Sequence, residues 1–253
     1  MAVARHIPRQ AVERAATVAW ATGMNAITPE ALATRNELSI AAAREHLDEA
    51  VRLELMDRQA LLVGYSELYT ATDYGRRLAR KHETIGGYSY CAGLKKCRVT
   101  IGGARHLIAC ASVAAALERR YPDHRVIGEL ELRKEEREQQ YPLISMTMPG
   151  QTWRRLHSPD LVIWPPAVPG EPLPLPVAIE VELSLKKKEE LTAICRGLAR
   201  ARNIEATIYF AGDRKIEEKL FDVIEELRAE ETIVVNPLSA IVDPIPGFPL
   251  TDE

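Results

Sequence analysis

Three acidic side chains are spaced so that they could meet on neighbouring strands of a β-sheet. Asp160 precedes a short apolar segment, Leu161–Trp164, and Glu180 and Glu182 lie within a second one, Val177–Leu183. Alternate residues of a strand point to the same face, so Glu180 and Glu182 share one face. If the two segments pair as a hairpin, Asp160 joins them from the start of the adjacent strand.

Close carboxylates favour the binding of a divalent cation, because the cation offsets the repulsion between like charges. Mg²⁺ commonly takes one or two carboxylates together with waters and phosphate oxygens. Such an ion can activate water and neutralise charge on a phosphodiester that is being hydrolysed. Asp160, Glu180 and Glu182 are therefore predicted to be catalytic residues that bind Mg²⁺ or Mn²⁺. The alternative is an acidic strand face exposed to solvent, and alternation alone does not separate the two.

Basic side chains near these acids are candidates for contact with substrate. Lys186 and Lys187 follow Glu182 closely and could contact a phosphate group. His106 and His157 could also contact substrate, and the alternative for each is a surface or capping role.

Glu129 is a candidate for a further metal ligand. It alternates with leucines in the segment 126–133, which is predicted to be a strand, and the charged residues 134–140 are predicted to form a loop or hairpin tip. The alternative is that Glu129 belongs only to the polar face of that strand.

The elements that position these residues alternate between helix and strand, which predicts an α/β domain over residues 104–236. The strand 177–183 should run into a helix that is capped by Ser184. The predicted helices are 105–120, 185–202 and 215–228, and the predicted strands are 126–133, 143–148, 152–156, 161–164, 177–183, 206–210 and 232–235.

The first 88 residues predict a smaller α+β domain with the element order of a winged helix-turn-helix. Thr28 and Ser39 are placed to cap two helices, of which the second runs to about Met56. A hairpin signal lies on either side of Gly64, with strands at 60–63 and 67–70. The full order is helix 10–23, the two capped helices, the hairpin and a last helix from Asp73 to about Lys81.

In that fold the helix after Ser39 enters the major groove of DNA. The candidate nucleic-acid contacts are basic residues of this helix, of the last helix and of the segment after it: Arg44, Arg52, Arg76, Arg77, Lys95, Lys96 and Arg98. Several acids accompany the arginines on the presumed recognition helix. The alternative is therefore a winged helix that serves as a homodimerisation module or a docking module for a partner protein.

Residues 89–103 are predicted to be a basic, glycine-rich linker, and residues 237–253 a proline-rich tail that packs loosely. The linker could follow a phosphate backbone, or it could be a solvated connector. The net charge of -3 over 253 residues requires any nucleic-acid contact to be local. No leader peptide or membrane-length apolar run is apparent, so the expected location is the cytoplasm without membrane contact. The four cysteines form no CxxC pair, which argues against a structural zinc site.

The arrangement Pro159-Asp160 followed by Glu180-x-Glu182 resembles the core of PD-(D/E)XK phosphodiesterases, as does the predicted order of helices and strands. The departure is Glu182, where that motif normally has Lys. Some active restriction endonucleases of this fold have Glu there, and Lys186 or Lys187 could replace the missing cation. Together with the winged helix, the pattern resembles the replication-relaxation proteins of plasmids and integrative elements over about residues 10–230.

The resemblance implies a DNA-binding protein of a mobile genetic element, with a role in replication or transfer. It implies a nuclease-like domain that uses Mg²⁺ or Mn²⁺ and could nick or cleave DNA. The alternative is a regulator on the same fold that has lost the chemistry and serves as a DNA-binding or protein-docking platform.

Overall fold

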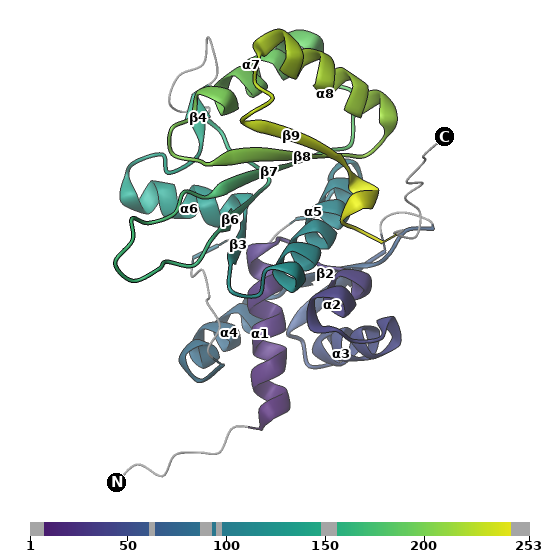
Figure 1. The fold of residues 1–253 in the computed structure, drawn as a ribbon. Coiled ribbons are helices and arrows are strands. Elements are labelled where there is room, and N and C mark those ends of the chain that lie inside the picture. The colour runs from purple at the N-terminus through teal and green to yellow at the C-terminus, as the bar shows by residue number, and fades with distance from the viewer. Residues whose placement is uncertain (1–7, 61–63, 87–92, 95–97, 148–155, 244–253) are drawn as a thin grey trace.

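A computed structural model of the protein describes residues 8–60, 64–86, 93–94, 98–147 and 156–243 (Figure 1). The architecture is mixed α/β: N-terminal helices with a two-strand hairpin are followed by a five-strand mixed sheet flanked by helices. At this level the predicted fold class is confirmed. No helix within the described ranges is long and apolar enough to cross a membrane.

The N-terminal part begins with three helices, and two of them start where their caps predict. The hydroxyls of Thr28 and Ser39 accept hydrogen bonds from the backbone N–H groups of Ala31 and Ala42. These N–H groups have no carbonyl partner inside the first turn, so the caps stabilise the helix ends. The helices are α1 (Arg9–Gly23), α2 (Pro29–Asn36) and α3 (Ile40–Arg52).

The first strand of the hairpin that follows lies earlier in the chain than the sequence predicts. Helix α3 ends at Arg52 rather than near Met56, and Glu54 then takes the left-handed conformation with φ 57°. The first strand therefore begins at Met56, and the predicted strand residues 61–63 lie outside the described ranges. The elements are β1 (Met56–Gln59), its antiparallel partner β2 (Leu68–Ala71) and α4 (Asp73–Gly86), which is longer than predicted.

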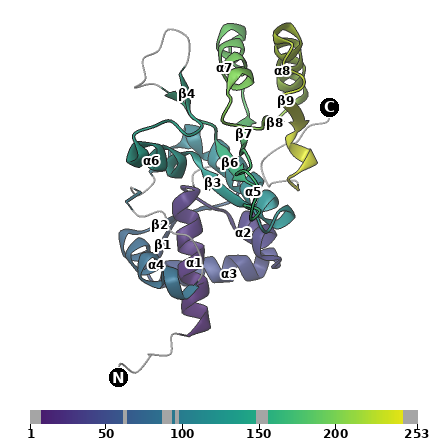
Figure 2. The same cartoon turned by 60° about the vertical axis from the view of Figure 1, so that its left-hand side comes forward.

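The sheet has the strand order β3-β6-β7-β8-β9, with the first three strands antiparallel and the last three parallel. Helices α7 and α8 cover one face and α5 packs on the other, which places the sheet between two helical layers (Figures 1 and 2). The elements are α5 (Ile101–Arg120), β3 (Arg125–Gly128), β6 (Leu161–Trp164), β7 (Val177–Glu182), α7 (Lys188–Arg200), β8 (Ala206–Ala211), α8 (Arg214–Leu227) and β9 (Ile233–Pro237).

The prediction of a strand over 126–133 and a loop over 134–140 is wrong beyond Gly128. Residues Glu129–Gln139 form helix α6. This segment consists of Glu, Leu, Arg, Lys and Gln, which all favour helix, and Leu132 is fully buried. The brief Glu-Leu alternation only imitates a strand. Gly128 permits the end of α1 to approach closely, because a Cβ there would lie 2.7 Å from the carbonyl oxygen of Gly23.

Three other boundaries differ from the prediction. The hairpin predicted at 143–156 is present as a short pair, β4 (Met146–Thr147) and β5 (Leu156–His157). Helix α7 starts at Lys188 instead of 185, because Ser184 bonds to Glu182 instead of capping the helix. The start of the tail packs closely: a 3₁₀ turn covers Leu238–Ala240, and Leu238 is fully buried.

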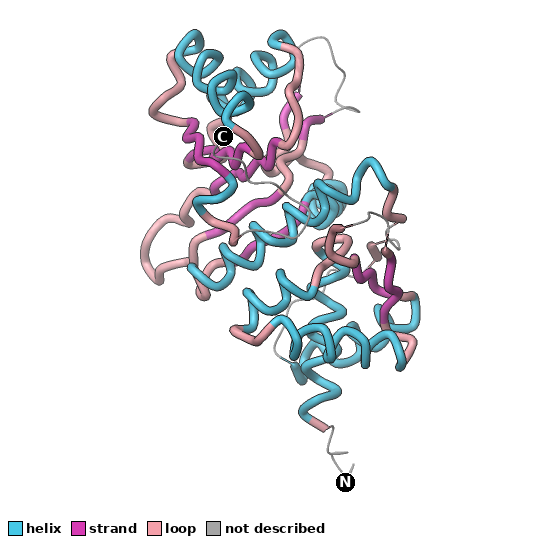
Figure 3. The backbone as a smooth tube through the Cα atoms, turned by 90° about the vertical axis from the view of Figure 1, so that its right-hand side faces the viewer, coloured by secondary structure: helices cyan, strands magenta, loops and turns pink. Residues whose placement is uncertain are grey.

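One hydrophobic core joins the N-terminal helices to the sheet. Buried residues of α1, α2 and α3 belong to the same cluster as those of α5, β6 and β7. Helix α5 contacts α2 and also strands β3 and β7, and in Figure 3 it runs between the N-terminal helices and the sheet. A second cluster lies between the opposite face of the sheet and helices α7 and α8.

Candidate functional site

Asp160 is held where three elements meet. It directly precedes β6, whose first residue pairs with Ile179 of β7. Its Oδ2 accepts a hydrogen bond of 2.8 Å from the backbone N–H of Val181, and its carbonyl oxygen accepts one of 3.0 Å from Glu129 at the start of α6. The hairpin therefore brings the Asp160 carboxylate against β7, with a fixed orientation.

Glu180 and Glu182 are buried, with exposed fractions of 7% and 5%. The alternative of a solvent-exposed acidic strand face is therefore wrong. The Glu180 Oε1 atom lies 2.7 Å from Nε2 of His157, which belongs to β5. Glu182 forms an ion pair with Lys186 in the segment between β7 and α7.

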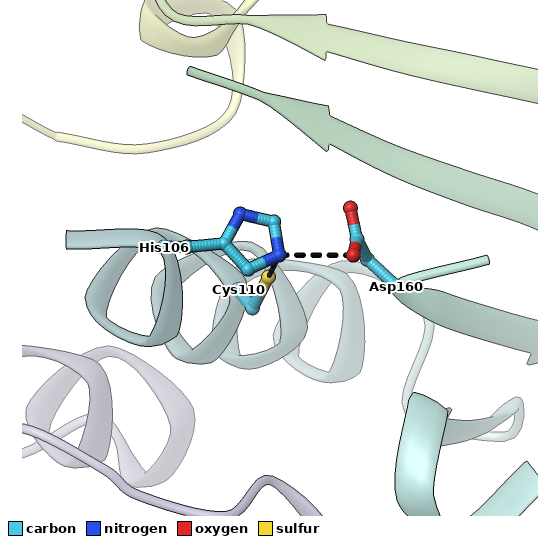
Figure 4. Close-up of side chains that lie close together, drawn as sticks. All are labelled: His106, Cys110 and Asp160. Carbon is cyan, nitrogen blue, oxygen red and sulfur yellow. Dashed lines mark hydrogen bonds and ion pairs between the residues drawn. The ribbon is translucent and has the colours of Figure 1, made fainter. Parts of the chain in front are cut away.

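Asp160 also has a basic partner, His106 of helix α5. The Nε2 atom of His106 lies 2.9 Å from Asp160 Oδ1, and the Sγ atom of Cys110 lies 3.4 Å from the same nitrogen (Figure 4). His106 and Cys110 are four residues apart, so they occupy one face of α5. Each of the three predicted catalytic acids is thus paired with a basic side chain.

Burial and these partners shift the protonation of the cluster. Burial raises the pKa of Glu180 to about 7, although the bond and charge of His157 act in the opposite direction. Burial alone would lower the pKa of His157, but the Glu180 hydrogen bond and charge outweigh it and the net shift is upward. The hydrogen bond to Asp160 raises the pKa of His106 in spite of burial. The pKa of Glu180 is therefore brought to neutral pH, while the pKa values of its neighbouring histidines shift upward.

Glu129 lies near this cluster, on the first turn of α6 instead of on a strand. Burial raises its pKa, Arg133 opposes that shift, and the charge of Asp160 adds to it. An ion pair of 2.5 Å joins Glu129 to Arg133, which also donates to the hydroxyl of Ser158. Glu129 is thus close enough for the charge of Asp160 to raise its pKa, but it already forms an ion pair with Arg133 of its own helix.

The two candidate phosphate-binding lysines are placed differently. Lys186 contacts Glu182, and its positive charge opposes the upward shift of the Glu180 pKa. Lys186 therefore belongs to the cluster. Lys187 is the exposed N-cap residue of α7. Of the two, the structure brings only Lys186 to the acids.

The predicted DNA-contacting residues are partly neutralised by neighbouring acids. Arg77 and Arg98 are exposed, and Lys95 and Lys96 lie outside the described residues. The other three arginines form ion pairs: Arg44 with Glu67 at 3.1 Å, Arg52 with Glu49 at 2.6 Å, and Arg76 with Asp73. The positive potential on the outer face of α3 is therefore weaker than its arginines alone would give.

Comparisons of the chain with protein-family models, with curated proteins and with solved structures gave no match. The function is therefore inferred from the geometry of the site itself.

Two groups at the site had little or no signal in the sequence. His157 was a candidate for substrate contact, but its pairing with Glu180 depends on β5, which the chain reaches through a separate hairpin. Cys110 had no predicted role at this site. The four-residue spacing from His106 was visible, whereas the approach of Asp160 to both depends on how α5 packs on the sheet.

Proposed function

We propose that the protein is a cytoplasmic DNA-binding protein of a mobile genetic element, with a nuclease-like α/β domain that uses Mg²⁺ or Mn²⁺ to nick or cleave DNA. The observation that carries this proposal is the position of half-buried Asp160 beside buried Glu180. The carboxylate of Asp160 bonds to the backbone next to Glu180, and its charge raises the Glu180 pKa. Two acids held next to each other on neighbouring strands, one of them buried, suit a divalent cation.

The donor chemistry of this pair fits a hard cation. Asp160 and Glu180 would supply the oxygen ligands, while Glu182 and Glu129 are already bound to Lys186 and Arg133. When bound, the ion would supply an activated water and neutralise phosphodiester charge. Lys186 would hold Glu182 in place and face the substrate phosphate, in the role that a lysine of the motif usually has.

The order of elements supports the resemblance to PD-(D/E)XK enzymes. Helix α5, antiparallel strands β3, β6 and β7, helix α7 and parallel strand β8 follow the order that the resemblance implies, with α6 inserted after β3. The N-terminal order α1, α2, α3, β1, β2, α4 supports a winged helix. DNA would lie along α3, with Arg77 and Arg98 as further phosphate contacts.

A specific observation favours a second candidate, a regulator without catalysis on the same fold. His106, His157 and Lys186 each pair with one of the three acids. Such pairing can offset the charge of buried acids without a metal. In this case the winged helix would bind DNA, a second copy of the chain or a partner protein.

Electron paramagnetic resonance of Mn²⁺ separates the two candidates, because the signal of the free ion falls when it binds. The nuclease proposal predicts one ion per chain and a loss of affinity of at least about 10-fold in Asp160→Asn and in Glu180→Gln. Glu171→Gln, in an exposed loop, serves as the matched control and should bind as the wild type does. If the wild type leaves the free Mn²⁺ signal unchanged, the regulator is the better account.

A further inference from the structure

A second set of metal-ligand types lies at the edge of the carboxylate cluster. His106 and Cys110 of α5 and Asp160 before β6 place one nitrogen, one sulfur and one oxygen within 4.8 Å of one another (Figure 4). Within the described residues, this is the one group of three His, Cys, Asp or Glu side chains that comes so close together. The three predicted acids do not form such a group.

The spacing of these atoms suits a tetrahedral ion. Bonds of about 2.0 to 2.3 Å to nitrogen, oxygen and sulfur, at tetrahedral angles, put neighbouring ligand atoms about 3.4 to 3.6 Å apart. The nitrogen–oxygen distance is 2.9 Å and the nitrogen–sulfur distance is 3.4 Å. These two distances would need to lengthen by only a few tenths of an ångström, and the oxygen–sulfur pair, which lies within 4.8 Å, would close around the ion.

We propose that His106, Cys110 and Asp160 form a binding site for a borderline-soft divalent cation of the Zn²⁺ class. Imidazole and thiolate ligands select Zn²⁺ and Co²⁺, whereas Mg²⁺ and Mn²⁺ prefer oxygen ligands. Three protein ligands leave one position of the tetrahedron for water or substrate. His106 is 42% exposed in its side chain, so solvent reaches this position although Cys110 is buried.

The protein holds the ligands in the orientations that such a site needs. The second oxygen of Asp160 accepts the Val181 N–H, which leaves Oδ1 directed toward His106. His106 and Cys110 share a helical face that is packed against the sheet. The proposal of this site rests on these contacts and is independent of the proposed nuclease function. Because Asp160 belongs to both sites, Zn²⁺ and Mn²⁺ should compete for it.

Titration of the full-length, metal-free protein with Co²⁺ tests this site, because a cysteine ligand produces a sulfur-to-cobalt charge-transfer band in the near ultraviolet. We expect this band, with saturation at one ion per chain. Cys110→Ser should abolish it. Cys195→Ser, which removes the other described buried thiol, should leave it unchanged, as should replacing Cys91 and Cys97 by Ser.

A further variant keeps the proposal testable if Cys110→Ser does not fold. Asp160→Asn retains the thiol and should keep the band while weakening Co²⁺ binding at least about 10-fold. Circular dichroism verifies that each variant is folded. A wild type without the band would overturn the proposal, and so would a band that persists in folded Cys110→Ser. Mn²⁺ binding is measured separately, so failure of this site and failure of the nuclease proposal remain distinguishable.

Discussion

At the scale of single residues, the candidate site combines buried acids with basic partners drawn from different parts of the chain. Sequence patterns placed Asp160, Glu180 and Glu182 near one another because they lie on two segments that form a hairpin. The partner His157 could not be assigned in this way, since its contact with Glu180 depends on β5. A hairpin is local along the chain, whereas these pairings are set by tertiary packing.

Lys186 is the residue whose proposed role in catalysis is most specific. Its cation lies beside Glu182, at the position where the PD-(D/E)XK motif that the chain resembles has a lysine. In the proposed nuclease, Lys186→Ala should lower the rate of DNA cleavage about 100-fold, because one positioned charge stabilises the developing charge of the reaction. Mn²⁺ affinity should change much less.

The matched control is Lys215→Ala, an exposed lysine on the first turn of α8. It should cleave at the wild-type rate, as measured by initial rates on the same plasmid. Equal rates for Lys186→Ala and the wild type would remove Lys186 from the mechanism.

His46 on α3 should make stability depend on pH. Burial and, next, the charge of Arg14 lower its pKa, and its Nε2 lies 3.0 Å from the Thr17 hydroxyl. The folded state therefore favours neutral His46. Its contribution to stability is complete above the unfolded value of about 6.5 and is lost as pH falls through the lower folded value.

Urea unfolding at about pH 8 and about pH 5 measures this effect, because the unfolded histidine is neutral at the first and charged at the second. Wild type should lose more stability on acidification than His46→Gln, which can keep the hydrogen bond to Thr17 but does not titrate. The same pH dependence in both proteins would show that His46 is not responsible.

At the scale of elements, helix caps were predictable and the start of α6 was not. Thr28 and Ser39 cap their helices by accepting hydrogen bonds from backbone N–H groups three residues away. Because these contacts are local, the sequence is nearly sufficient to predict them. The segment Glu129–Gln139 begins with an alternation typical of a strand, yet its helix-favouring composition and the burial of Leu132 prevail. A strand-like alternation over four residues is too short to outweigh the helix preference of all eleven residues of the segment.

Close packing between α4 and the segment that joins α3 to β1 predicts a sharp difference between two glycines. A Cβ on Gly75 would lie 2.1 Å from the carbonyl oxygen of Leu55, which is backbone and cannot rotate away. Gly75→Ala should therefore destabilise the protein by about 1–3 kcal/mol. Gly102→Ala, on the first turn of α5, meets nothing within 4 Å and should be neutral or stabilise by up to about 1 kcal/mol.

Chemical denaturation of the two variants beside wild type provides the measurement. The comparison is matched, because both changes replace a helical glycine by alanine. Equal stabilities for the two variants would mean that α4 can move away from Leu55 at little cost.

At the scale of the whole molecule, the hydrophobic core crosses the predicted domain boundary. Helix α5 packs on α2 and on the sheet, and Glu118 of α5 accepts hydrogen bonds from Trp20 and Arg35. The predicted domain boundary at residues 89–103 therefore remains a prediction. The packing indicates that the two parts would remain associated even without a covalent connection.

A specific protease site inserted within residues 87–92 tests this association. After cleavage, the two fragments should co-elute from a size-exclusion column at the volume of the uncut protein, because apolar surface buried between them would otherwise meet water. Fragments that separate in native buffer would show that the two parts are independent.

Metal-dependent cleavage of DNA is the measurement that bears most directly on the proposed function. Supercoiled plasmid, single-stranded DNA and branched DNA are incubated with the metal-free protein before and after addition of Mn²⁺ or Mg²⁺. We predict nicked or linear products only with metal, and a rate at least about 100-fold lower for Asp160→Asn. Binding of DNA without cleavage of any substrate, or equal cleavage by Asp160→Asn, would contradict the account.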